Sequence, residues 1–547
     1  MTSFYHKLLN NHKWALGLIC FFAVFFFLGL GSFHLFDWDE INFAESAREM
    51  LVSGDYLHVQ INYEPFWEKP PFFFWLQALS MAFFGVTEFA ARFPNAIFGV
   101  IYMITLYLIG RKHFDRKFGL IWALLFTASL LPHVYFKSGI IDPVFNYFIF
   151  LSIYFMILVL GKAEKHVHWF AMLSGLSSGM AVLTKGPVGF LLLGLTLLIY
   201  LLINRFKNFP PIKHILLFFI GFFLVISSWL MMEYLQNGMD VLIQFVEYQI
   251  DLFRSPVAGH AQPFYYHFVV VFFGCFPISI FALPNLFKTQ ETIEFDLDKW
   301  MRILFWVVII LFSIVTTKII HYSSMTYLPL SFLAAYTLYH ASVKEESLNK
   351  SLSTTFIVVG ALIGAAILTI ILIVVYKSNF EFLFDDEFVR ASMSVTPNWF
   401  GWEPAIGLVF IIGIILSTVW LGKRKYLYSV ISLATTTSLT LLLVQLLFIP
   451  KLEDHTQGPL IEMCEYAEKE EAILVSYGFK SYAPYFYGKV DPRSSEEKDM
   501  QWLLHAKTDK KILFVSKITN RDLDQNPEFK LIQQKGGYKL FERIIEP

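Results

Sequence analysis

Charge and cysteine are scarce in this sequence. Of its 547 residues only 16% are Asp, Glu, Lys or Arg, whereas 56% are hydrophobic and 18% are aromatic, and the mean hydropathy is +0.55. The net charge of −1 provides no basic surplus for binding nucleic acid. Of the three cysteines, two lie inside apolar segments and one in the polar C-terminal part, which excludes a disulfide framework. There is no internal repeat and no glycine-rich loop to hold phosphates, so we expect no nucleotide or redox cofactor.

Long apolar runs dominate the sequence instead. A helix needs about 20 apolar residues to cross a bilayer, so the sequence predicts a polytopic α-helical membrane protein with about thirteen spans. No small-residue cleavage site follows the first run, residues 14–35, and we expect a retained membrane helix there. The predicted spans begin near Trp14, Pro94, Phe118, Pro143, Trp169, Gly186, His214, Phe264, Met301, Ser323, Thr354, Glu403 and Tyr426.

The lysines and arginines predict how the chain is oriented. Short cytoplasmic loops are enriched in these residues, and here alternate loops carry them. The loop with Asp39 and everything after the last span are therefore expected on the outer side of the membrane. The residues in question are Arg111, Lys112, Arg116, Lys117, Lys162, Lys165, Arg205, Lys207, Lys213, Lys288, Lys299, Arg302, Lys344, Lys350, Lys423, Arg424 and Lys425.

The interiors of the predicted spans contain almost no ionisable residues. Ion-coupled transporters usually keep such groups near the membrane midplane. This pattern favours chemistry at the outer interface over a lipid flippase or transporter, which remains the alternative from another functional class.

Ionisable residues are instead concentrated in residues 36–75. Apolar residues recur at helical spacing over residues 41–51, which predicts a short amphipathic helix along the membrane interface. Asp39 and Glu40 then lie at its N-terminus, where the helix dipole favours carboxylates. Two adjacent acids there could serve as a general base, hold a metal ion, or only cap the helix.

A Glu-Lys-Pro-Pro string follows at residues 68–71. Prolines are favoured in the first turn of a helix, so this string predicts a second helix and, with the first, outer juxtamembrane helices at about residues 38–82. Lys69 offers a cation that could meet a phosphate. The alternative is a snorkelling lysine paired with Glu68.

Other polar residues stand at the outer ends of predicted spans. Asp142 precedes a proline and is either a catalytic acid or a helix cap. Lys185, in a Lys-Gly-Pro string, interrupts an apolar stretch. The alternative to a functional role is a simple membrane hairpin. Tyr322 follows a lysine and a histidine and could belong to a belt of interfacial anchors.

The outer segment from residue 233 to 263 contains Arg254 and His260. A single histidine is usually structural, but His260 with a carboxylate such as Glu68 could form a zinc pair. Together with the acids, these cations suit a cavity for a phosphate-bearing lipid.

The composition changes to that of a soluble protein near residue 450. Short apolar runs at residues 473–475, 512–515 and 538–541 alternate with polar stretches, which predicts a small α/β domain. We therefore divide the chain into a membrane domain, residues 1–449, and a periplasmic domain, residues 450–547.

Several strings in this sequence resemble the signature of bacterial GT-C membrane glycosyltransferases, the group of the lipid A aminoarabinose transferases and the protein O-mannosyltransferase relatives. The first is DE-x-x-x-A-E-x-A-R-E-M-L-x-S-G-D-Y from Asp39, followed by E-K-P-P. GVTEFAARFP, LTKGPVG, GHAQPFYY and TKIIHYSSMTYLP follow in order, so that the resemblance covers about residues 14–450.

The resemblance implies a polyprenyl-phosphate sugar donor and transfer with inversion. It implies that Asp39 is the catalytic acid-base residue with Glu40 as its companion, and that Lys69 grips the lipid phosphate. By the same resemblance Glu68 and His260 bind a divalent metal, with zinc expected. The remaining implied roles are catalytic for Asp142 and phosphate-binding for Arg254, Tyr322 and Lys185.

The leading hypothesis is thus a sugar transferase that acts on an envelope glycolipid, with lipid A as the expected acceptor. A protein O-glycosyltransferase with the same kind of donor is the alternative within the class. The sugar, the choice between acceptors, the metal, the role of the C-terminal domain and the oligomeric state stay open at this point.

Overall fold

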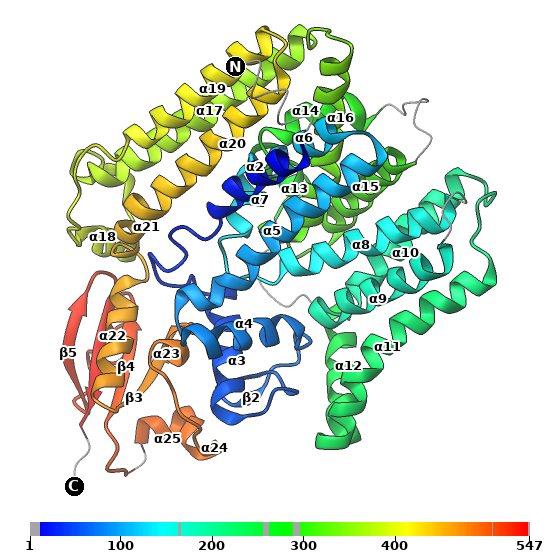
Figure 1. The fold of residues 1–547 in the computed structure, drawn as a ribbon. Helices are drawn as coiled ribbons and strands as arrows, with labels where there is room; N and C mark the ends of the chain where they lie inside the picture. The colour runs from blue at the N-terminus through cyan, green and yellow to red at the C-terminus, as the bar shows by residue number, and fades with distance from the viewer. Residues whose placement is uncertain (1–10, 162–165, 255–261, 288–295, 506, 545–547) are drawn as a thin grey trace.

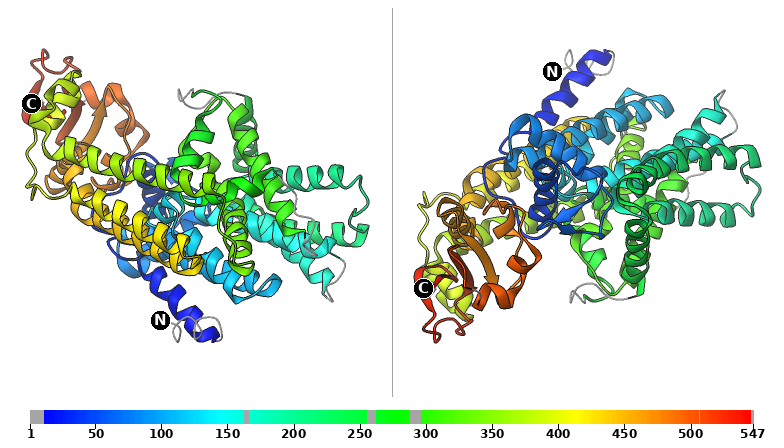
Figure 2. Two further views of the ribbon diagram at one scale, coloured as in Figure 1. Left: turned by 90° about the horizontal axis from the view of Figure 1, so that it is seen from above. Right: turned by 90° about the horizontal axis from the view of Figure 1, so that it is seen from below.

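The structure is a computed structural model that describes residues 11–161, 166–254, 262–287, 296–505 and 507–544. Most of the chain is helical, and a small sheet lies at one end of the helix bundle (Figures 1 and 2). The predicted class, a polytopic helical membrane protein with a small C-terminal α/β region, is confirmed.

The first half of the chain is built almost entirely of helices. These are α2 (His12–Val24), α3 (Asp39–Ser53), α4 (Phe72–Phe84), α5 (Glu88–His113), α6 (Arg116–Thr127), α7 (Leu130–Tyr135), α8 (Asp142–Leu160), α9 (Val167–Lys185), α10 (Val188–Ile203), α11 (Ile212–Asn237) and α12 (Met239–Arg254). The two-residue strands β1 (Gln60–Ile61) and β2 (Glu64–Pro65) pair as a short antiparallel hairpin between α3 and α4.

The bundle continues through a second set of helices. These are α13 (Tyr266–Gly274), α14 (Ile278–Leu286), α15 (Leu297–Ile314), the 3₁₀ segment η1 (Ile320–Thr326), α16 (Tyr327–Val343), α17 (Lys350–Val375), η2 (Lys377–Asn379), η3 (Glu381–Leu383), α18 (Glu387–Ser394), α19 (Ala405–Gly422), α20 (Tyr426–Leu443), η4 (Val444–Phe448) and α21 (Ile449–Glu453).

Fewer helices are long enough to span a membrane than the sequence predicts. Seven described helices are sufficiently long and apolar, namely α5, α8, α9, α11, α17, α19 and the run Tyr426–Glu453, and the pair α13 and α14, bent by 119°, gives at most an eighth. A helix starts at or near each of the expected positions, but several are short. The 13 residues of α2 cover only about 20 Å of a hydrocarbon core that is about 30 Å thick. The count of about thirteen spans is therefore not confirmed.

Helices α9 and α11 pack closely against each other, because glycines lie at their contact. A Cβ atom on Gly175 would lie 1.9 Å from the carbonyl oxygen of Phe218, and one on Gly221 would lie 2.4 Å from that of Met172. Small residues at such crossings allow helix backbones to approach closely in a membrane. This packing places Lys185, the last residue of α9, at a fixed position at the end of the bundle that carries α3 and α4.

The two juxtamembrane helices begin and end as local chemistry predicts. Asp39 is the first residue of α3, and Gly54 ends the helix with a φ of 74°, a left-handed conformation that glycine adopts at low cost. Pro71 caps α4, as the Pro-Pro pair predicts.

The C-terminal region forms a four-stranded sheet in the order β3-β4-β6-β5. Strands β3 and β4 are parallel, whereas β6 is antiparallel to both of its neighbours, and α22 packs on the sheet. The expected boundary at residue 450 falls inside a helical run that continues to Glu453. The elements are α22 (Gly458–Lys469), β3 (Ile473–Tyr477), α23 (Ala483–Phe486), α24 (Ser495–Lys498), α25 (Met500–His505), β4 (Ile512–Lys517), β5 (Phe529–Lys535) and β6 (Tyr538–Arg543).

Candidate active site

Four ionisable side chains from different elements lie together at the end of the bundle that faces the sheet. Asp39 starts α3, Asp142 starts α8, Lys185 ends α9, and His321 lies in η1. Direct contacts join Asp39 to His321 and Asp142 to Lys185. The charges of Asp142 and Lys185 also act on His321, although these residues come from distant parts of the chain. They form a single cluster, which we call the polar cluster.

Asp39 is the most accessible carboxylate of this cluster. Its side chain is 41% exposed, and its Oδ2 lies 3.5 Å from Nε2 of His321, a side chain that is only 15% exposed. An accessible carboxylate oriented by a buried imidazole has the arrangement of a general base.

The environment of His321 favours its neutral form. Burial lowers the pKa of this imidazole, and the positive charges of Lys185 and Lys69 lower it further, whereas the carboxylates of Asp142 and Asp39 oppose the shift. The lowering wins, so that at neutral pH the imidazole is mostly uncharged. A neutral His321 can orient the Asp39 carboxylate by a hydrogen bond without neutralising its charge.

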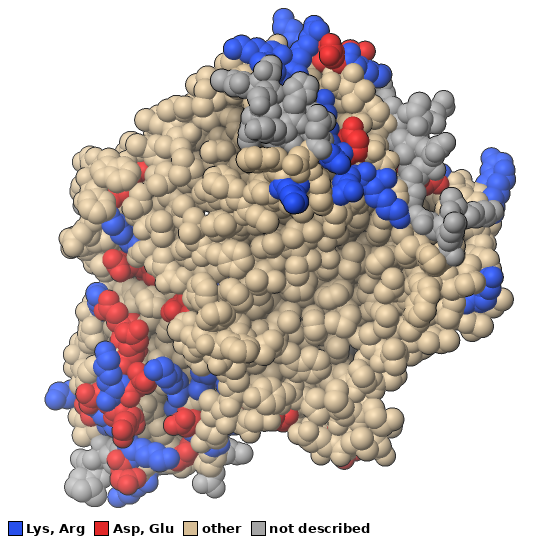
Figure 3. Space-filling model, viewed as in Figure 1, with Lys and Arg blue, Asp and Glu red and all other residues tan. Residues whose placement is uncertain are grey.

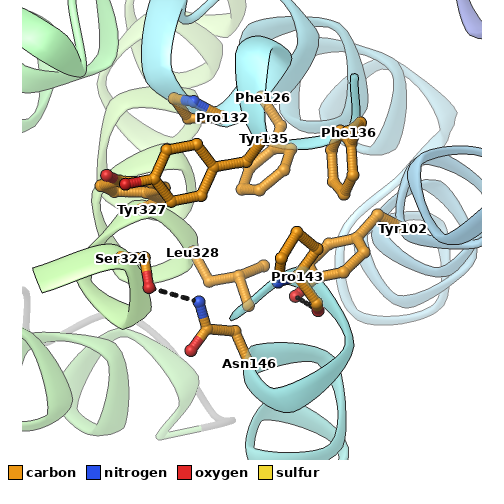
Figure 4. Close-up of a pocket in the computed structure, with 10 residues that line it drawn as sticks. All are labelled: Tyr102, Phe126, Pro132, Tyr135, Phe136, Pro143, Asn146, Ser324, Tyr327 and Leu328. Carbon is orange, nitrogen blue, oxygen red and sulfur yellow. Dashed lines mark hydrogen bonds between the residues drawn. The ribbon is translucent and has the colours of Figure 1, made fainter. Parts of the chain in front are cut away.

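Asp142 contacts two other side chains directly. Its Oδ1 lies 2.6 Å from Nζ of Lys185 and accepts a hydrogen bond of 3.3 Å from Oγ of Ser324. Ser324 in turn accepts a hydrogen bond of 2.8 Å from Nδ2 of Asn146, as Figure 4 shows. These contacts fix Lys185 in the polar cluster.

A small cavity adjoins this chain of contacts. It has a volume of about 20 Å³, roughly that of one water molecule, and Asn146 and Ser324 provide polar groups in a wall that is otherwise mostly aromatic (Figure 4). Tyr102 and Tyr327 form part of the aromatic wall (Figure 4). The cavity thus adjoins Ser324 and Asn146, the side chains that lead to Asp142.

Tyr322 covers the cluster on one side. Its ring centroid lies 5.7 Å from Nζ of Lys185 and 5.5 Å from the ring of Phe312. Burial raises the pKa of Tyr322 to about 12, helped by the negative charges of Glu68, Asp142 and Asp39. The phenol therefore keeps its proton and can donate a hydrogen bond to an anion.

Lys69 and Glu68 lie close enough to the cluster to act on it electrostatically. The charge of Lys69 lowers the pKa of His321, and that of Glu68 raises the pKa of Tyr322. Within the pair, Nζ of Lys69 lies 2.6 Å from Oε1 of Glu68, and the two side chains are 16% and 33% exposed. The paired state that the sequence left open is thus present, and it leaves Lys69 beside the polar cluster.

Glu40 points away from its neighbour Asp39. It is buried and accepts hydrogen bonds of 3.0 and 2.9 Å from the guanidinium of Arg92, as well as bonds from the amides of Phe36 and Gly139. Arg92 also donates to three carbonyl groups, those of Leu30, Phe33 and His34. These bonds engage both carboxylate oxygens, so Glu40 fastens the chain before α3 instead of joining the cluster.

Two residues of the predicted site cannot be placed. His260 lies outside the described residues, and of Arg254 the structure describes only its position at the end of α12. Among the residues that are described, no group of three or more His, Cys, Asp or Glu side chains could hold a metal ion. A zinc ion on Glu68 and His260 therefore stays a prediction.

Helix α3 is buried on its polar face as well as on its apolar face. Every residue from Glu40 to Met50 is buried, including the charged Glu45, Arg48 and Glu49. Arg48 pairs with Glu45 at 2.7 Å and donates to the carbonyl of Val490 in the C-terminal region. The position of α3 along the membrane interface stays a prediction, and periodicity alone does not reveal that its polar face is covered by distant parts of the chain.

A groove of about 520 Å³ lies between α10 and α15. Its wall is apolar apart from Lys299 and Arg302, which stand at the start of α15. Helix α10 begins just after Lys185, and α15 ends shortly before the segment of His321 and Tyr322. One end of the groove thus lies toward the polar cluster. The residues that line it are Leu195, Ile199, Ile203, Phe287, Lys299, Arg302, Ile303, Trp306, Val307, Ile310, Leu311 and Ile314.

Ser324 and Arg92 are support residues that the sequence did not single out, and His321 was noted only beside Tyr322, with an interfacial anchor belt as the alternative. His321 stood in the TKIIHY string next to Tyr322, which was the available signal. Nothing near Ser324 or Arg92 in the sequence indicates their partners, because those partners come from other helices.

Known proteins share both sequence and fold with this chain. Residues 68–231 match the family model described as dolichyl-phosphate-mannose-protein mannosyltransferase. The undecaprenyl phosphate-alpha-4-amino-4-deoxy-L-arabinose arabinosyl transferase of Wigglesworthia glossinidia brevipalpis is 26% identical over 67% of this chain and 65% of its own length. That of Pectobacterium atrosepticum is 26% identical over 64% of each chain.

The whole chain has a structural counterpart. ArnT from Cupriavidus metallidurans, solved with undecaprenyl phosphate bound, superposes with a TM-score of 0.78 at 19% identity, covering 98% of this chain and 100% of ArnT. By sequence, the chain spans slightly less than two thirds of the length of the Wigglesworthia relative. By its fold, the chain is a multi-pass membrane protein of the GT-C type, and its sequence is similar to those of undecaprenyl phosphate-aminoarabinose transferases.

Proposed function

We propose that the protein is an inverting glycosyltransferase that moves a sugar from a polyprenyl-phosphate donor to lipid A at the outer face of the inner membrane. The observation that carries this proposal is the polar cluster: an accessible carboxylate, Asp39, lies beside His321 and near the cations Lys69 and Lys185. The names of the curated relatives and of the structural counterpart support the type of donor.

The donor would bind with its phosphate at the cations and its chain in the membrane. Lys69 and Lys185, with Tyr322 as a hydrogen-bond donor and Arg254 as a further cation, would hold the phosphate. The apolar groove between α10 and α15 would take the polyprenyl chain. Negative charge grows on the phosphate as the sugar leaves, so fixed cations there stabilise the transition state.

Asp39 would act on the acceptor from the face of the sugar opposite the phosphate. The acceptor oxygen forms a bond to the anomeric carbon while the bond from that carbon to the phosphate oxygen breaks, and the electron pair leaves with the polyprenyl phosphate. Any proton on the acceptor oxygen passes to Asp39. Asp142 would hold Lys185 in place and bias His321 by its charge. The role of Glu40 would be structural.

The acceptor decides how much Asp39 contributes as a base. A phosphate acceptor has a second pKa near 6 and is largely deprotonated at neutral pH, whereas a Ser or Thr hydroxyl is not. Transfer to lipid A phosphate would therefore depend weakly on pH above neutrality. In Asp39→Asn, which lacks the base, the residual transfer to a hydroxyl would rise steeply with pH, whereas the residual transfer to a phosphate would not.

The distribution of charge supports a periplasmic site. Lys and Arg side chains gather at the end of the bundle remote from the sheet, whereas both signs of charge are mixed over the sheet (Figure 3). By the positive-inside rule the remote end would face the cytoplasm. The polar cluster and the C-terminal region would then face the periplasm.

A divalent metal remains part of the proposal as a prediction about Glu68 and His260. No chemical step above depends on a metal, because the described residues do not bring a set of ligands together. Metal analysis of the purified protein tests it: zinc at about one per chain that falls with His260→Ala would support the site, and a metal-free active enzyme would exclude it.

A protein O-glycosyltransferase is the second candidate, favoured by the family model over residues 68–231. Purified protein in nanodiscs, supplied with a labelled polyprenyl-phosphate sugar and either lipid A or a Ser/Thr-rich peptide, separates the two. Label in lipid A supports the first proposal, and label in the peptide supports the second. Movement of the donor between leaflets without transfer would contradict both and restore the flippase hypothesis.

A further inference from the structure

We propose that Trp38, Lys480 and Tyr482 form a binding site for the phosphorylated sugar headgroup of the acceptor, and that the C-terminal region thereby contributes to acceptor recognition. This inference rests on the proposed function and deepens it. The site combines the residue before Asp39 with the loop between β3 and α23.

The loop and the residue are fastened together through Asp37. Its carboxylate accepts hydrogen bonds from Oγ of Ser481 and from the amide of Tyr482, the latter at 3.2 Å to each oxygen. Gln457 adds a second link, because its Oε1 accepts from the amide of Asp37 at 3.3 Å. The chain that leads into Asp39 is thus bound directly to the C-terminal region.

Two aromatic rings and a cation meet at this junction. The rings of Trp38 and Tyr482 are perpendicular, with centroids 5.7 Å apart. Nζ of Lys480 lies 4.8 Å from the centroid of Trp38 and 5.3 Å from that of Tyr482. Such distances are those of a cation held over ring faces. Trp38 is 49% exposed and Lys480 is exposed, whereas Tyr482 is buried and only 8% exposed.

The junction lies beside the residues that would carry out the transfer. Trp38 directly precedes Asp39, and the charges of Glu68, Asp37 and Asp39 all act on Tyr482, raising its pKa to about 12 together with the larger effect of burial. Three carboxylates around this point would repel an anionic acceptor. Lys69 already pairs with Glu68. The carboxylate of Asp37 is engaged by Ser481 and Tyr482. Lys480 adds a cation from the C-terminal region, and its charge acts on Asp37.

The chemistry of these groups fits a phosphorylated sugar. An exposed indole face can pack against the apolar face of a sugar ring, and an ammonium group forms a charge-assisted hydrogen bond with a phosphate. Tryptophan also anchors proteins at membrane interfaces, but that role requires a ring turned to lipid. Here the ring is packed against Tyr482 and Lys480 of the C-terminal region, which favours a binding role.

The experiment compares Lys480→Gln with Lys530→Gln, a matched change of an exposed lysine on β5. Initial rates of transfer are measured in nanodiscs with bisphosphorylated lipid A and with enzymatically dephosphorylated lipid A as acceptors. For the bisphosphorylated acceptor, Lys480→Gln is expected to raise KM about tenfold, the effect of one hydrogen bond to a charged group, and to leave kcat within about twofold. With the dephosphorylated acceptor its KM should equal that of the native chain, and Lys530→Gln should match the native chain with both.

A second measurement does not depend on transfer. Native mass spectrometry of the detergent-purified protein gives the fraction that retains bisphosphorylated lipid A, which should fall several-fold in Lys480→Gln and stay unchanged in Lys530→Gln. An unchanged KM in an active Lys480→Gln enzyme, or equal retention of lipid A by all three proteins, would overturn the inference and leave the proposed function standing. If the native chain transfers nothing to lipid A, the proposed function fails, and the retention measurement still decides whether the site exists.

Discussion

At the scale of single residues, two adjacent acids have opposite environments. Asp39 is 41% exposed and faces His321, whereas Glu40 is buried against Arg92. The sequence placed both at the start of a helix, which the structure confirms, but it could not distinguish them. The distinction depends on Arg92, Phe36 and Gly139, which surround Glu40 alone.

The pair Asp39→Asn and Glu40→Gln tests this difference. Asp39→Asn should fold normally and lose about a hundredfold or more in kcat, because Asp39 positions the acceptor oxygen and takes any proton that this oxygen carries. Glu40→Gln should lose folded yield and thermal stability, because Arg92 is left as a buried charge without its partner, a change that costs about 3 kcal/mol or more. Transfer rates and fluorescence-detected size-exclusion chromatography measure the two effects, and a fully active Asp39→Asn protein would contradict the proposed role.

At the scale of elements, the segment between α2 and α3 is held at several points by the end of the chain. His34 pairs with Glu453 at 3.1 Å, and the amide of Leu35 donates to the hydroxyl of Tyr487 at 2.7 Å. Helical periodicity predicted where α3 and α4 start, since caps and apolar spacing are local signals. The burial of α3 and its ion pairs could not be predicted, because they depend on a hairpin and a C-terminal segment that no local pattern connects to it.

The contact of His34 with Glu453 makes a testable contribution to stability that depends on pH. Burial opposes charge on His34, but the hydrogen bond and charge of Glu453 prevail and raise its pKa above 6.5, so this stabilisation is complete below pH 6.5 and is lost as the pH rises through the raised value.

The window of full stabilisation is therefore the range below pH 6.5. His34→Gln should lower the melting temperature most in that window and least near pH 9, by an amount that corresponds to less than about 1 kcal/mol. Thermal unfolding of the detergent-solubilised protein across pH measures this, with His166→Gln, a change of an exposed histidine, as the control. A difference that does not change between pH 5.5 and pH 9 would contradict this account of the pair.

At the scale of the whole molecule, the site is assembled by parts that are far apart in the sequence. Asp142 meets Lys185, and Asp39 meets His321, through helices that pack only in the folded bundle. Composition predicted the membrane class and the small C-terminal sheet, because both are compositional properties. The predicted number of spans is not confirmed, because described helices such as α2 and α10 are apolar but shorter than a span.

Removal of residues 458–547 tests how the sheet region contributes. It would remove three hydrogen bonds that hold the chain around α3. These join the hydroxyl of Tyr487 to the amide of Leu35, the carbonyl of Val490 to Arg48, and Ser481 to Asp37. We therefore expect the truncated protein to lose transfer activity even though the membrane-spanning helices are retained. The milder Tyr487→Phe, which removes one of these bonds, should cost about 1 kcal/mol of stability and keep most of the activity. An active truncated protein would show that the region is dispensable for positioning Asp39.

The most direct test of the central claim is mass spectrometry of lipid A from cells that lack this protein, complemented with the native chain or with Asp39→Asn. The account predicts that a sugar mass is missing from lipid A in the deletion strain and returns with the native chain but not with Asp39→Asn. A mass lost only from glycopeptides, or lipid A that is identical in all strains, would contradict it.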